Sequence, residues 1–192
     1  MSNQIKELIQ SSINAKQLVL ENEALINTVN RVTDIIVAAF KNGNSVYFCG
    51  NGGSAADAQH LAAEFSGRFY KDRKALPAEA LHCNTSYLTA VANDYSFDVI
   101  YARLIQGLGK PGDILIGLST SGNSKNIVQA FETARDKQMT TIGFTGESGG
   151  LMKAFSEHLV NIPSTDTPRI QECHMLLGHI ICQLVEEKYF NE

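Results

Sequence analysis

Apolar residues in the first 42 positions recur at spacings of three and four, the period of an amphipathic helix. The repeating positions are Leu8, Ile9, Ile13, Leu25, Ile26, Val29, Ile35, Ile36 and Phe40. Asn22 and Glu23 fall between two such sets and predict a break between two helices. Most of these apolar residues are expected in the core. Two helices before the first strand exceed what a small sheet needs, so residues 1–42 are also expected to contact another subunit.

From residue 45 onward the period changes to short apolar runs separated by helical patterns. The runs predict strands at 45–49, 78–82, 113–118, 140–145 and 158–162. The helical patterns cover 54–66, 86–92, 97–108, 123–138, 151–155 and 168–189. Alternating strands and helices indicate parallel pairing with crossovers, and continuously apolar strands indicate a sheet covered on both faces. The predicted class is α/β, a doubly wound five-stranded parallel sheet with additional N-terminal helices.

Length and charge narrow the classes of function. A chain of 192 residues suits one domain, 1–192. The net charge of -4 argues against nucleic-acid binding, which needs a basic face. The longest apolar runs fall short of the roughly 20 residues of a membrane helix, and the N-terminus lacks the pattern of a signal peptide. Four cysteines without a C-x-x-C pair indicate reduced thiols, so a cytoplasmic protein is expected.

The first candidate binding element is a glycine-rich loop after the first predicted strand. The segment runs Gly50-Asn51-Gly52-Gly53-Ser54 and opens a helix. Free N–H groups at a helix N-terminus suit an anion, although a plain strand-to-helix turn uses the same residues. Gly50, Gly52 and Ala55 also fit a relaxed dinucleotide fingerprint. That fingerprint expects an acid at the end of the next strand, whereas Asp72 precedes the strand.

The second element follows the third predicted strand and carries four hydroxyls within six residues. It reads Ser119-Thr120-Ser121-Gly122-Asn123-Ser124 and again runs into a helix. Hydroxyls and N–H groups can surround a phosphate without a Lys or Arg, although a capped turn would look similar. A dinucleotide would not require this second loop, whereas a phosphorylated polyol would. Ligands in such folds lie at the carboxyl ends of the strands.

Candidate acid and base groups lie on two predicted helices. His60 and Glu64 are four residues apart, which places them on one helix face. Such a pair can hold zinc, or it can be an exposed polar pair. The last helix carries Gln171 and His179, and a lone histidine there is usually a core side chain. The dipeptide 93–94, Asn-Asp, is equally consistent with a turn and with a ligand contact.

Four segments together resemble the phosphoheptose isomerases, a branch of the SIS (sugar isomerase) domain family with a flavodoxin-like sheet. They are GNGGSAADAQHLAAEFSGRF, VANDYSFD, GLSTSGNS and TPRIQECHMLLGH, in the order of that family. The resemblance implies interconversion of sedoheptulose 7-phosphate and D-glycero-D-manno-heptose 7-phosphate. This is the first step toward ADP-heptose for the bacterial envelope, carried out by a cytoplasmic homotetramer.

The resemblance also implies roles for particular residues. Glu64 is the expected base and His179 the expected acid. The expected substrate contacts are Asn51, Gly52, Gly53, Glu64, Asn93, Asp94, Ser119, Thr120, Ser121, Ser124 and Gln171. Family members that carry zinc use the positions of His60, Glu64, Gln171 and His179, so one zinc ion per site is expected. The partners are then the phosphorylated sugar and copies of the chain, with no nucleic acid and no membrane.

The spacing of two expected zinc ligands adds a constraint. Gln171 and His179 are eight residues apart, a rise of about 12 Å along one helix. Two residues so far apart would not readily share one ion, so one of them is expected to come from a neighbouring subunit. The spatial expectation is that the helix carrying His60 and Glu64 places them beside a sugar whose phosphate lies at residues 119–124.

Three other functions compete with isomerase activity. A non-catalytic SIS protein that binds the replication initiator shares both loops but lacks the carboxylate and the histidine present here at Glu64 and His179. A sugar-phosphate-sensing regulator would need a further module, for which the chain has no room. A dinucleotide-dependent oxidoreductase is disfavoured by the missing acid and by the hydroxyl-rich loop.

Overall fold

A five-stranded, all-parallel sheet forms the centre of the computed structural model, which describes residues 2–190. The strands are β1 (Val46–Gly50), β2 (Ala78–Ala80), β3 (Ile114–Leu118), β4 (Thr140–Thr145) and β5 (His158–Asn161). Their order across the sheet is β2-β1-β3-β4-β5. This is the flavodoxin-like order of a doubly wound sheet, so the predicted fold class is confirmed.

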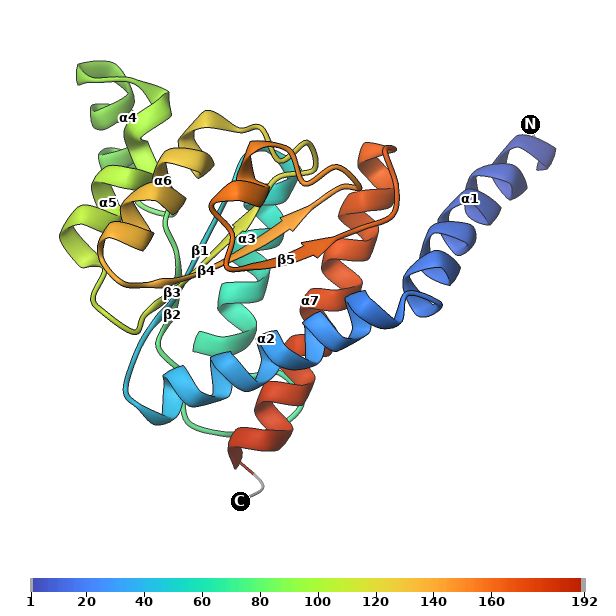
Figure 1. Ribbon diagram of the computed structural model, residues 1–192, viewed down its shortest axis with the longest axis horizontal. Coiled ribbons are helices and arrows are strands. Elements are labelled where there is room, and N and C mark those ends of the chain that lie inside the picture. The colour runs from blue at the N-terminus through green and yellow to red at the C-terminus, as the bar shows by residue number, and fades with distance from the viewer. Residues whose placement is uncertain (1, 191–192) are drawn as a thin grey trace.

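Helices cover both faces of the sheet (Figure 1). They are α1 (Ser2–Leu20), α2 (Glu23–Lys41), α3 (Gly53–Ser66), α4 (Thr85–Asp94), α5 (Ile100–Leu108), α6 (Lys125–Asp136) and α7 (Thr167–Phe190), with short 3-10 turns η1 (Phe97–Val99) and η2 (Leu151–Ala154). Helices α2, α3 and α7 pack on one face, and α4, α5 and α6 with η2 pack on the other.

The predicted elements are present, with local differences. The helix expected at 97–108 is divided into η1 and α5, and β2 ends at Ala80, two residues earlier than expected. The predicted break at Asn22 is confirmed, because its side chain accepts a hydrogen bond from the Leu25 N–H and caps α2. The dipeptide Asn93-Asp94 forms the end of α4 and does not follow it.

The sheet is buried on both faces, which explains the continuously apolar strands. Every residue of β3 is buried, and so are four of the five residues of β1. Side chains that alternate along each strand therefore enter two separate hydrophobic clusters, one under each helical layer. This double coverage keeps the strands fixed and leaves their carboxyl ends as the exposed edge where loops can hold a ligand.

The two candidate binding loops leave the sheet side by side. Gly50 at the end of β1 lies opposite Leu118 at the end of β3 in the parallel register. From this point the chain after β1 enters α3 on one face, and the chain after β3 enters α6 on the other. Neighbouring strands whose connections diverge in this way define the topological switch point, where ligands bind in open α/β sheets.

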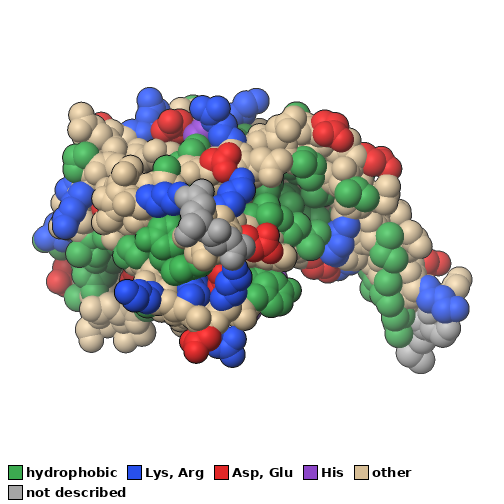
Figure 2. All heavy atoms as spheres, turned by 90° about the horizontal axis from the view of Figure 1, so that it is seen from below, with side chains coloured by type: hydrophobic (Ala, Val, Ile, Leu, Met, Phe, Trp, Pro, Cys, Tyr) green, Lys and Arg blue, Asp and Glu red, His purple; other side chains and the backbone are tan. Residues whose placement is uncertain are grey.

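Helix α1 departs from the sequence expectation. Leu8, Ile9 and Ile13 were expected in the core, but they are 57%, 55% and 51% exposed. Only the C-terminal half of α1, through Ala15 and Val19, joins the hydrophobic cluster. Figure 1 shows α1 projecting from the body, and Figure 2 shows hydrophobic side chains gathered along this arm. The amphipathic period is present, but the apolar side of the helix has no partner within residues 2–190.

None of the helices within residues 2–190 combines the length and the apolarity that a membrane crossing requires.

Candidate active site

The first loop places main-chain N–H groups at the start of α3. Gly52 precedes the helix with a φ of +56°, and Ser54 in its first turn is buried. Gly52 and Gly53 are exposed, and the N–H groups of Ala55 and Ala56 donate to the Gly52 carbonyl at 3.1 and 3.2 Å. The first helical N–H groups have no partner within the helix and carry a partial positive charge. The N-terminal end of α3 therefore has a charge distribution that favours an anion, and its use as a binding position stays a prediction.

The second loop is held in shape by contacts within the loop and to the segment after β4. The hydroxyls of Ser119 and Ser124 lie 3.0 Å apart. The side chain of Asn123 accepts a hydrogen bond from the Leu151 N–H at 3.0 Å and donates one to the Ser121 carbonyl. Only Ser119 of the four hydroxyl residues is buried. Thr120, Ser121 and Ser124 keep access to solvent, as a phosphate site requires.

Glycine is required at one position of this second loop. Gly122 has a φ of +67°, and a Cβ there would lie 2.2 Å from the carbonyl oxygen of Gly149. The carbonyl of Gly122 also accepts a hydrogen bond from the Met152 N–H at 2.9 Å. The loop is therefore pressed against the segment 149–152, which fixes the direction of its hydroxyl groups.

A residue that the sequence interpretation missed connects the two loops. Asn126 in α6 is buried and exchanges two hydrogen bonds of 2.9 Å with Asn51 in the first loop. Asn51 was expected to contact substrate, but in this structure its side-chain amide is engaged with Asn126. An asparagine at the second position of a helix gives no local signal of such a role. The pair fixes the spacing between the loops and leaves the main-chain N–H groups of the first loop for the ligand.

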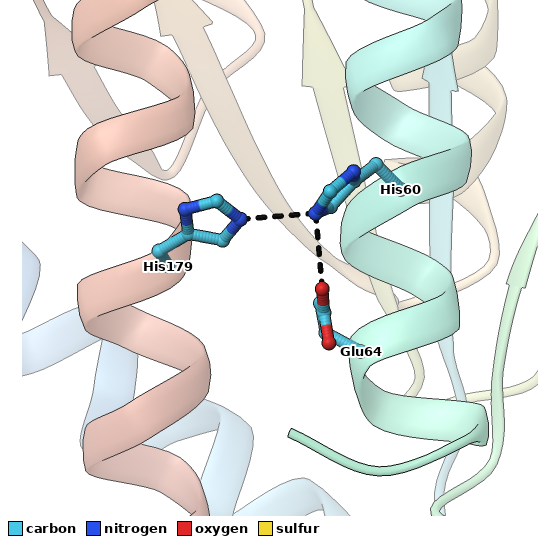
Figure 3. Close-up of side chains that lie close together, drawn as sticks. All are labelled: His60, Glu64 and His179. Carbon is cyan, nitrogen blue, oxygen red and sulfur yellow. Dashed lines mark hydrogen bonds and ion pairs between the residues drawn. The ribbon is translucent and has the colours of Figure 1, made fainter. Parts of the chain in front are cut away.

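Three ligating side chains meet on the facing sides of α3 and α7. The Nε2 atoms of His60 and His179 are 3.0 Å apart, and His60 Nε2 is 3.0 Å from Glu64 Oε1. Figure 3 shows His60 and Glu64 pointing from α3 toward His179 on α7. The side chain of His60 is 49% exposed and that of Glu64 is 22% exposed, so the cluster opens to solvent. The same-face pair predicted from the spacing is confirmed, and His179 joins it.

The close approach of the two helices depends on Gly178. A Cβ at this position would lie 2.6 Å from both methyl carbons of Leu61, a buried side chain of α3. The absent side chain lets α7 lie directly against α3. His179 is the next residue, and it consequently reaches His60, which precedes Leu61. Nothing local in the sequence indicates this pairing across 119 residues.

The three clustered atoms cannot all satisfy one another by hydrogen bonding, whereas each of them could bind a cation. One imidazole nitrogen has either a single hydrogen or a single lone pair, so His60 Nε2 cannot fully satisfy both Glu64 and His179. The three ligand atoms lie within 4.8 Å of one another. Zinc with three protein ligands commonly uses such a nitrogen and oxygen set, and tetrahedral Zn–N bonds of about 2.0–2.1 Å separate two ligand atoms by about 3.3 Å. The residues therefore fit zinc.

Gln171, the fourth expected ligand, lies elsewhere in the same chain. Its Nε2 donates to Ser54 Oγ at 3.4 Å, and a Cβ on Gly53 would lie 2.7 Å from that nitrogen. Gln171 therefore sits at the start of α3, whereas His179 sits at His60. This agrees with the expectation that the two cannot share one ion within a single chain. Gln171 instead joins the first loop.

The acid–base cluster and the anion-binding loops also occupy different parts of α3. Seven residues separate Gly53 from His60 and eleven separate it from Glu64, a rise of about 10–16 Å along the helix. The expectation that α3 places His60 and Glu64 beside a sugar whose phosphate lies at residues 119–124 stays a prediction. Asn93 and Asp94 are exposed, and the amide of Asn93 hydrogen-bonds to the Asp94 carboxylate at 2.9 Å.

Asp57 lies on α3 between the first loop and the pair His60 and Glu64. It lies four residues after Gly53 and three before His60, which places it on the same face of α3. Its Oδ2 atom is buried and has no hydrogen-bond partner among residues 2–190. Burial raises the pKa of this carboxyl, and the nearby His60 opposes the rise. Asp57 is a further acceptor that the sequence interpretation did not select.

Comparisons with known proteins agree with this geometry. The family model for the SIS domain matches residues 11–146. A phosphoheptose isomerase of Clostridium acetobutylicum is 50% identical over 100% of this chain and 98% of its own. The structure of a phosphoheptose isomerase from Neisseria gonorrhoeae has a TM-score of 0.91 and 38% identity, over 97% of this chain and 98% of that one. The corresponding structure from Francisella tularensis has a TM-score of 0.92 and 34% identity, over 96% and 97%.

A flavodoxin-like sheet with a glycine-rich and a hydroxyl-rich loop at its switch point, together with the match over residues 11–146, defines an SIS domain protein. The match to the relatives covers almost their entire length and so spans the segments that carry both loops and the α3–α7 cluster. The chain belongs to the phosphoheptose isomerases within the SIS domain family.

Proposed function

We propose that this protein is an aldose–ketose isomerase that interconverts sedoheptulose 7-phosphate and D-glycero-D-manno-heptose 7-phosphate. The observation that carries the proposal is the convergence of His60, Glu64 and His179 on the facing sides of α3 and α7. A carboxylate and imidazoles provide the proton-transfer groups for isomerisation. The reaction would stand at the start of nucleotide-activated heptose biosynthesis in the cytoplasm.

The two loops at the switch point suit the phosphate of such a sugar. The free N–H groups at the start of α3 and the exposed hydroxyls of Thr120, Ser121 and Ser124 can all bind phosphate oxygens. No Lys or Arg is needed for this arrangement. Gln171, beside Gly53, can donate to a sugar oxygen from the same position. These contacts orient the sugar and leave the proton transfers to another part of the site.

Proton transfer requires a base at carbon and a second group at oxygen. Glu64 would remove the proton from the carbon beside the carbonyl and return it to the neighbouring carbon, through an enediol. His179, with its Nε2 free of metal, would donate a proton to one oxygen and accept one from the other. The carboxylate of Glu64 has two oxygens, so Oε1 can face His60 while Oε2 serves the carbon proton.

A zinc ion would fit among His60, Glu64 and His179, with Gln171 of a second chain as a fourth ligand. When bound, zinc polarises a carbonyl oxygen and so assists proton loss from the adjacent carbon. Gln171 cannot reach the cluster of its own chain, because it lies against Gly53 and Ser54. We therefore propose that the complete site forms between subunits, where the loops of one chain meet the cluster of another.

The apolar side of α1 supports assembly into an oligomer, for which we propose a tetramer. Ile5, Leu8, Ile9 and Ile13 are each more than half exposed, at helical spacing. A contiguous exposed apolar surface of this kind indicates a protein contact. Helix α1 is also anchored to α7, because Lys16 pairs with Glu172, the neighbour of Gln171, and Arg169 donates a hydrogen bond to the Leu8 carbonyl. Contacts through α1 would thus lie next to the substrate loops.

The alternative of a non-catalytic SIS protein that binds the replication initiator is less well supported. This chain retains the carboxylate at Glu64 and the histidine at His179, which that relative lacks, and the structure places them in one cluster. The relatives of high coverage described above carry the isomerase name.

The direct test is turnover of sedoheptulose 7-phosphate, followed by NMR in deuterium oxide before and after treatment with a chelator. Isomerisation through an enediol introduces solvent deuterium at the carbon beside the carbonyl. We expect product formation with this label, and a decrease after chelation that added zinc reverses. Absence of both turnover and exchange, combined with a thermal shift caused by NAD but not by the sugar phosphate, would favour a dinucleotide-binding protein.

Assembly is tested by light scattering coupled to size-exclusion chromatography. Ile9→Asp places a charge on the exposed apolar side of α1 and is expected to reduce the mass from that of a tetramer. Gln10→Asp adds the same charge at the neighbouring exposed position and should leave the mass unchanged. A monomeric wild-type protein that is fully active would contradict the shared site.

A further inference from the structure

The buried side chain of Arg73 lies at the C-terminal end of α3, next to the main chain of Glu64. The side chain of Arg73 is 3% exposed, and its guanidinium donates to the carbonyl of Glu64 at 2.6 Å and to that of Phe65 at 2.7 Å. The last carbonyls of a helix lack partners, and a cation near them is favourable. Arg73 therefore holds the main chain of Glu64 itself, from a loop nine residues further on.

The partner of Arg73 comes from α7. Glu186 is 2% exposed and accepts a hydrogen bond from Arg73 Nε at 2.9 Å. Its carboxylate also accepts from the main-chain N–H groups of Phe69, Tyr70 and Lys71, at 3.3, 2.9 and 2.8 Å. One carboxylate thereby ties the loop after α3 to the helix that carries His179. Charge-assisted bonds of this kind set geometry firmly.

The tied loop places an aromatic ring against the expected acid. The ring of Phe69 lies stacked on the imidazole of His179, with centroids 5.7 Å apart and planes inclined by 26°. The same imidazole also contacts His60, with ring centroids 5.0 Å apart. His179 therefore contacts both an aromatic ring and a second imidazole, and both contacts restrict the rotation of its ring.

We propose that Phe69, held by the Arg73–Glu186 pair, is a positioning residue that fixes the imidazole of His179 toward Glu64 and His60. This inference rests on the proposed isomerase function and extends it to residues with no direct contact with the sugar. A buried ion pair often adds little net stability compared with apolar side chains of similar size. We therefore assign this pair a role in positioning His179 and not in stability, because a displacement of about 1 Å in a catalytic group can lower a rate by about 10²-fold.

The activity test uses substitutions of Phe69 on the full-length protein. Phe69→Leu keeps an apolar side chain but removes the ring, and we expect kcat to fall about tenfold while KM stays within about twofold. Phe69→Tyr retains the ring and should restore kcat. Phe97→Leu makes the same change at a 52% exposed position in η1, on the other face of the sheet from α3 and α7, and should behave as wild type. Wild-type kcat in Phe69→Leu, or an equal loss in Phe69→Tyr, would overturn the proposal.

A second readout separates this inference from the proposed function. The ring current of Phe69 shifts the proton resonances of the His179 imidazole, so Phe69→Leu should move them and Phe97→Leu should not. This measurement does not depend on turnover of a heptose phosphate. If the wild-type protein shows no turnover, the proposed isomerase function is rejected, and the NMR experiment still tests the contact between Phe69 and His179. Unmoved resonances in Phe69→Leu would refute the contact. Glu186→Gln removes the carboxylate charge that accepts hydrogen bonds from the loop and from Arg73. We expect this variant to show the same loss of kcat as Phe69→Leu. A wild-type kcat would argue against a role for the Arg73–Glu186 pair.

Discussion

Asn51 and Asn126 bind each other through two reciprocal amide hydrogen bonds of 2.9 Å each, and so join the loop after β1 to the helix after β3. Each amide donates one hydrogen bond to the other and accepts one, and each keeps a second N–H and a second lone pair for other contacts. Because the loops flank the switch point of the sheet, this pair sets the width of the position where the phosphate is proposed to bind.

The substitution Asn126→Asp should widen that position. The introduced carboxylate would retain one hydrogen bond but turn an acceptor oxygen toward Asn51 Oδ1, and it would bury a negative charge near a bound phosphate. We expect a loss of about 1–3 kcal/mol in the free energy of unfolding and a higher KM with a smaller change in kcat. Urea unfolding and steady-state kinetics measure both, with Asn30→Asp on the exposed side of α2 as the charge control. Equal effects in the two variants would argue against the pairing.

The two proposed proton-transfer groups can be separated from the binding loops by kinetics. Glu64→Gln and His179→Gln each preserve approximate size, and each should lower kcat by about 10²-fold or more. The sugar should still bind, because neither residue belongs to the loops. Glu132→Gln, on the surface of α6, and His158→Gln, on β5, serve as matched controls. Retention of wild-type kcat in either site variant would remove that residue from the reaction.

The shape of the second loop is tested at Gly122. An alanine there must adopt a φ of +67° and place its Cβ 2.2 Å from the Gly149 carbonyl oxygen, so the loop has to move. A residue forced into such a conformation costs about 1–3 kcal/mol. We expect lower stability and a raised KM for the phosphorylated sugar. Gly107→Ala, in α5, meets no atom within 4 Å and should stabilise by about 0.5–1 kcal/mol.

Stability should decline in mild acid because of His174. Complete burial lowers the pKa of its imidazole to about 4, despite a contact with the Thr145 carbonyl. The unfolded chain protonates this side chain near pH 6.5, so the folded state binds fewer protons below that pH. The contribution is fully present above about pH 6.5, and about 3 kcal/mol of it is lost as the pH falls to about 4. Urea unfolding at pH 7.5, 6 and 5 should show this slope in the wild type and a weaker one in His174→Gln.

The interpretation of the sequence succeeded where the signals are local. The glycine and hydroxyl loops stand where predicted, because strand ends and helix starts are marked by neighbouring residues. The spacing of His60 and Glu64 placed both on one helix face for the same reason. Helix α1 shows the limit of such signals. Its apolar period predicted a helix with a buried face, yet Leu8 and Ile9 are exposed in this structure.

The partners across long sequence separations were not predictable. Asn126 and Phe69 lie in an ordinary helix and an ordinary loop, and nothing near them in the chain indicates Asn51 or His179 as partners. Their roles arise from packing, which depends on the whole sheet. The sequence interpretation set Glu64 beside a sugar whose phosphate lies at residues 119–124, and the structure adds that Glu64 and the first loop are separated along α3.

The amino-acid sequence by itself determined the order of strands and helices, the two loops and the residue types available for proton transfer, since periodicity and turn chemistry act over a few residues. The tertiary structure decided which distant residues meet. Gly178 allows α7 to lie against Leu61 of α3, and this contact brings His179 to His60 while it leaves Gln171 beside Gly53. Such contacts follow from the close packing of two helices on one face of a sheet, which no short stretch of the chain can specify.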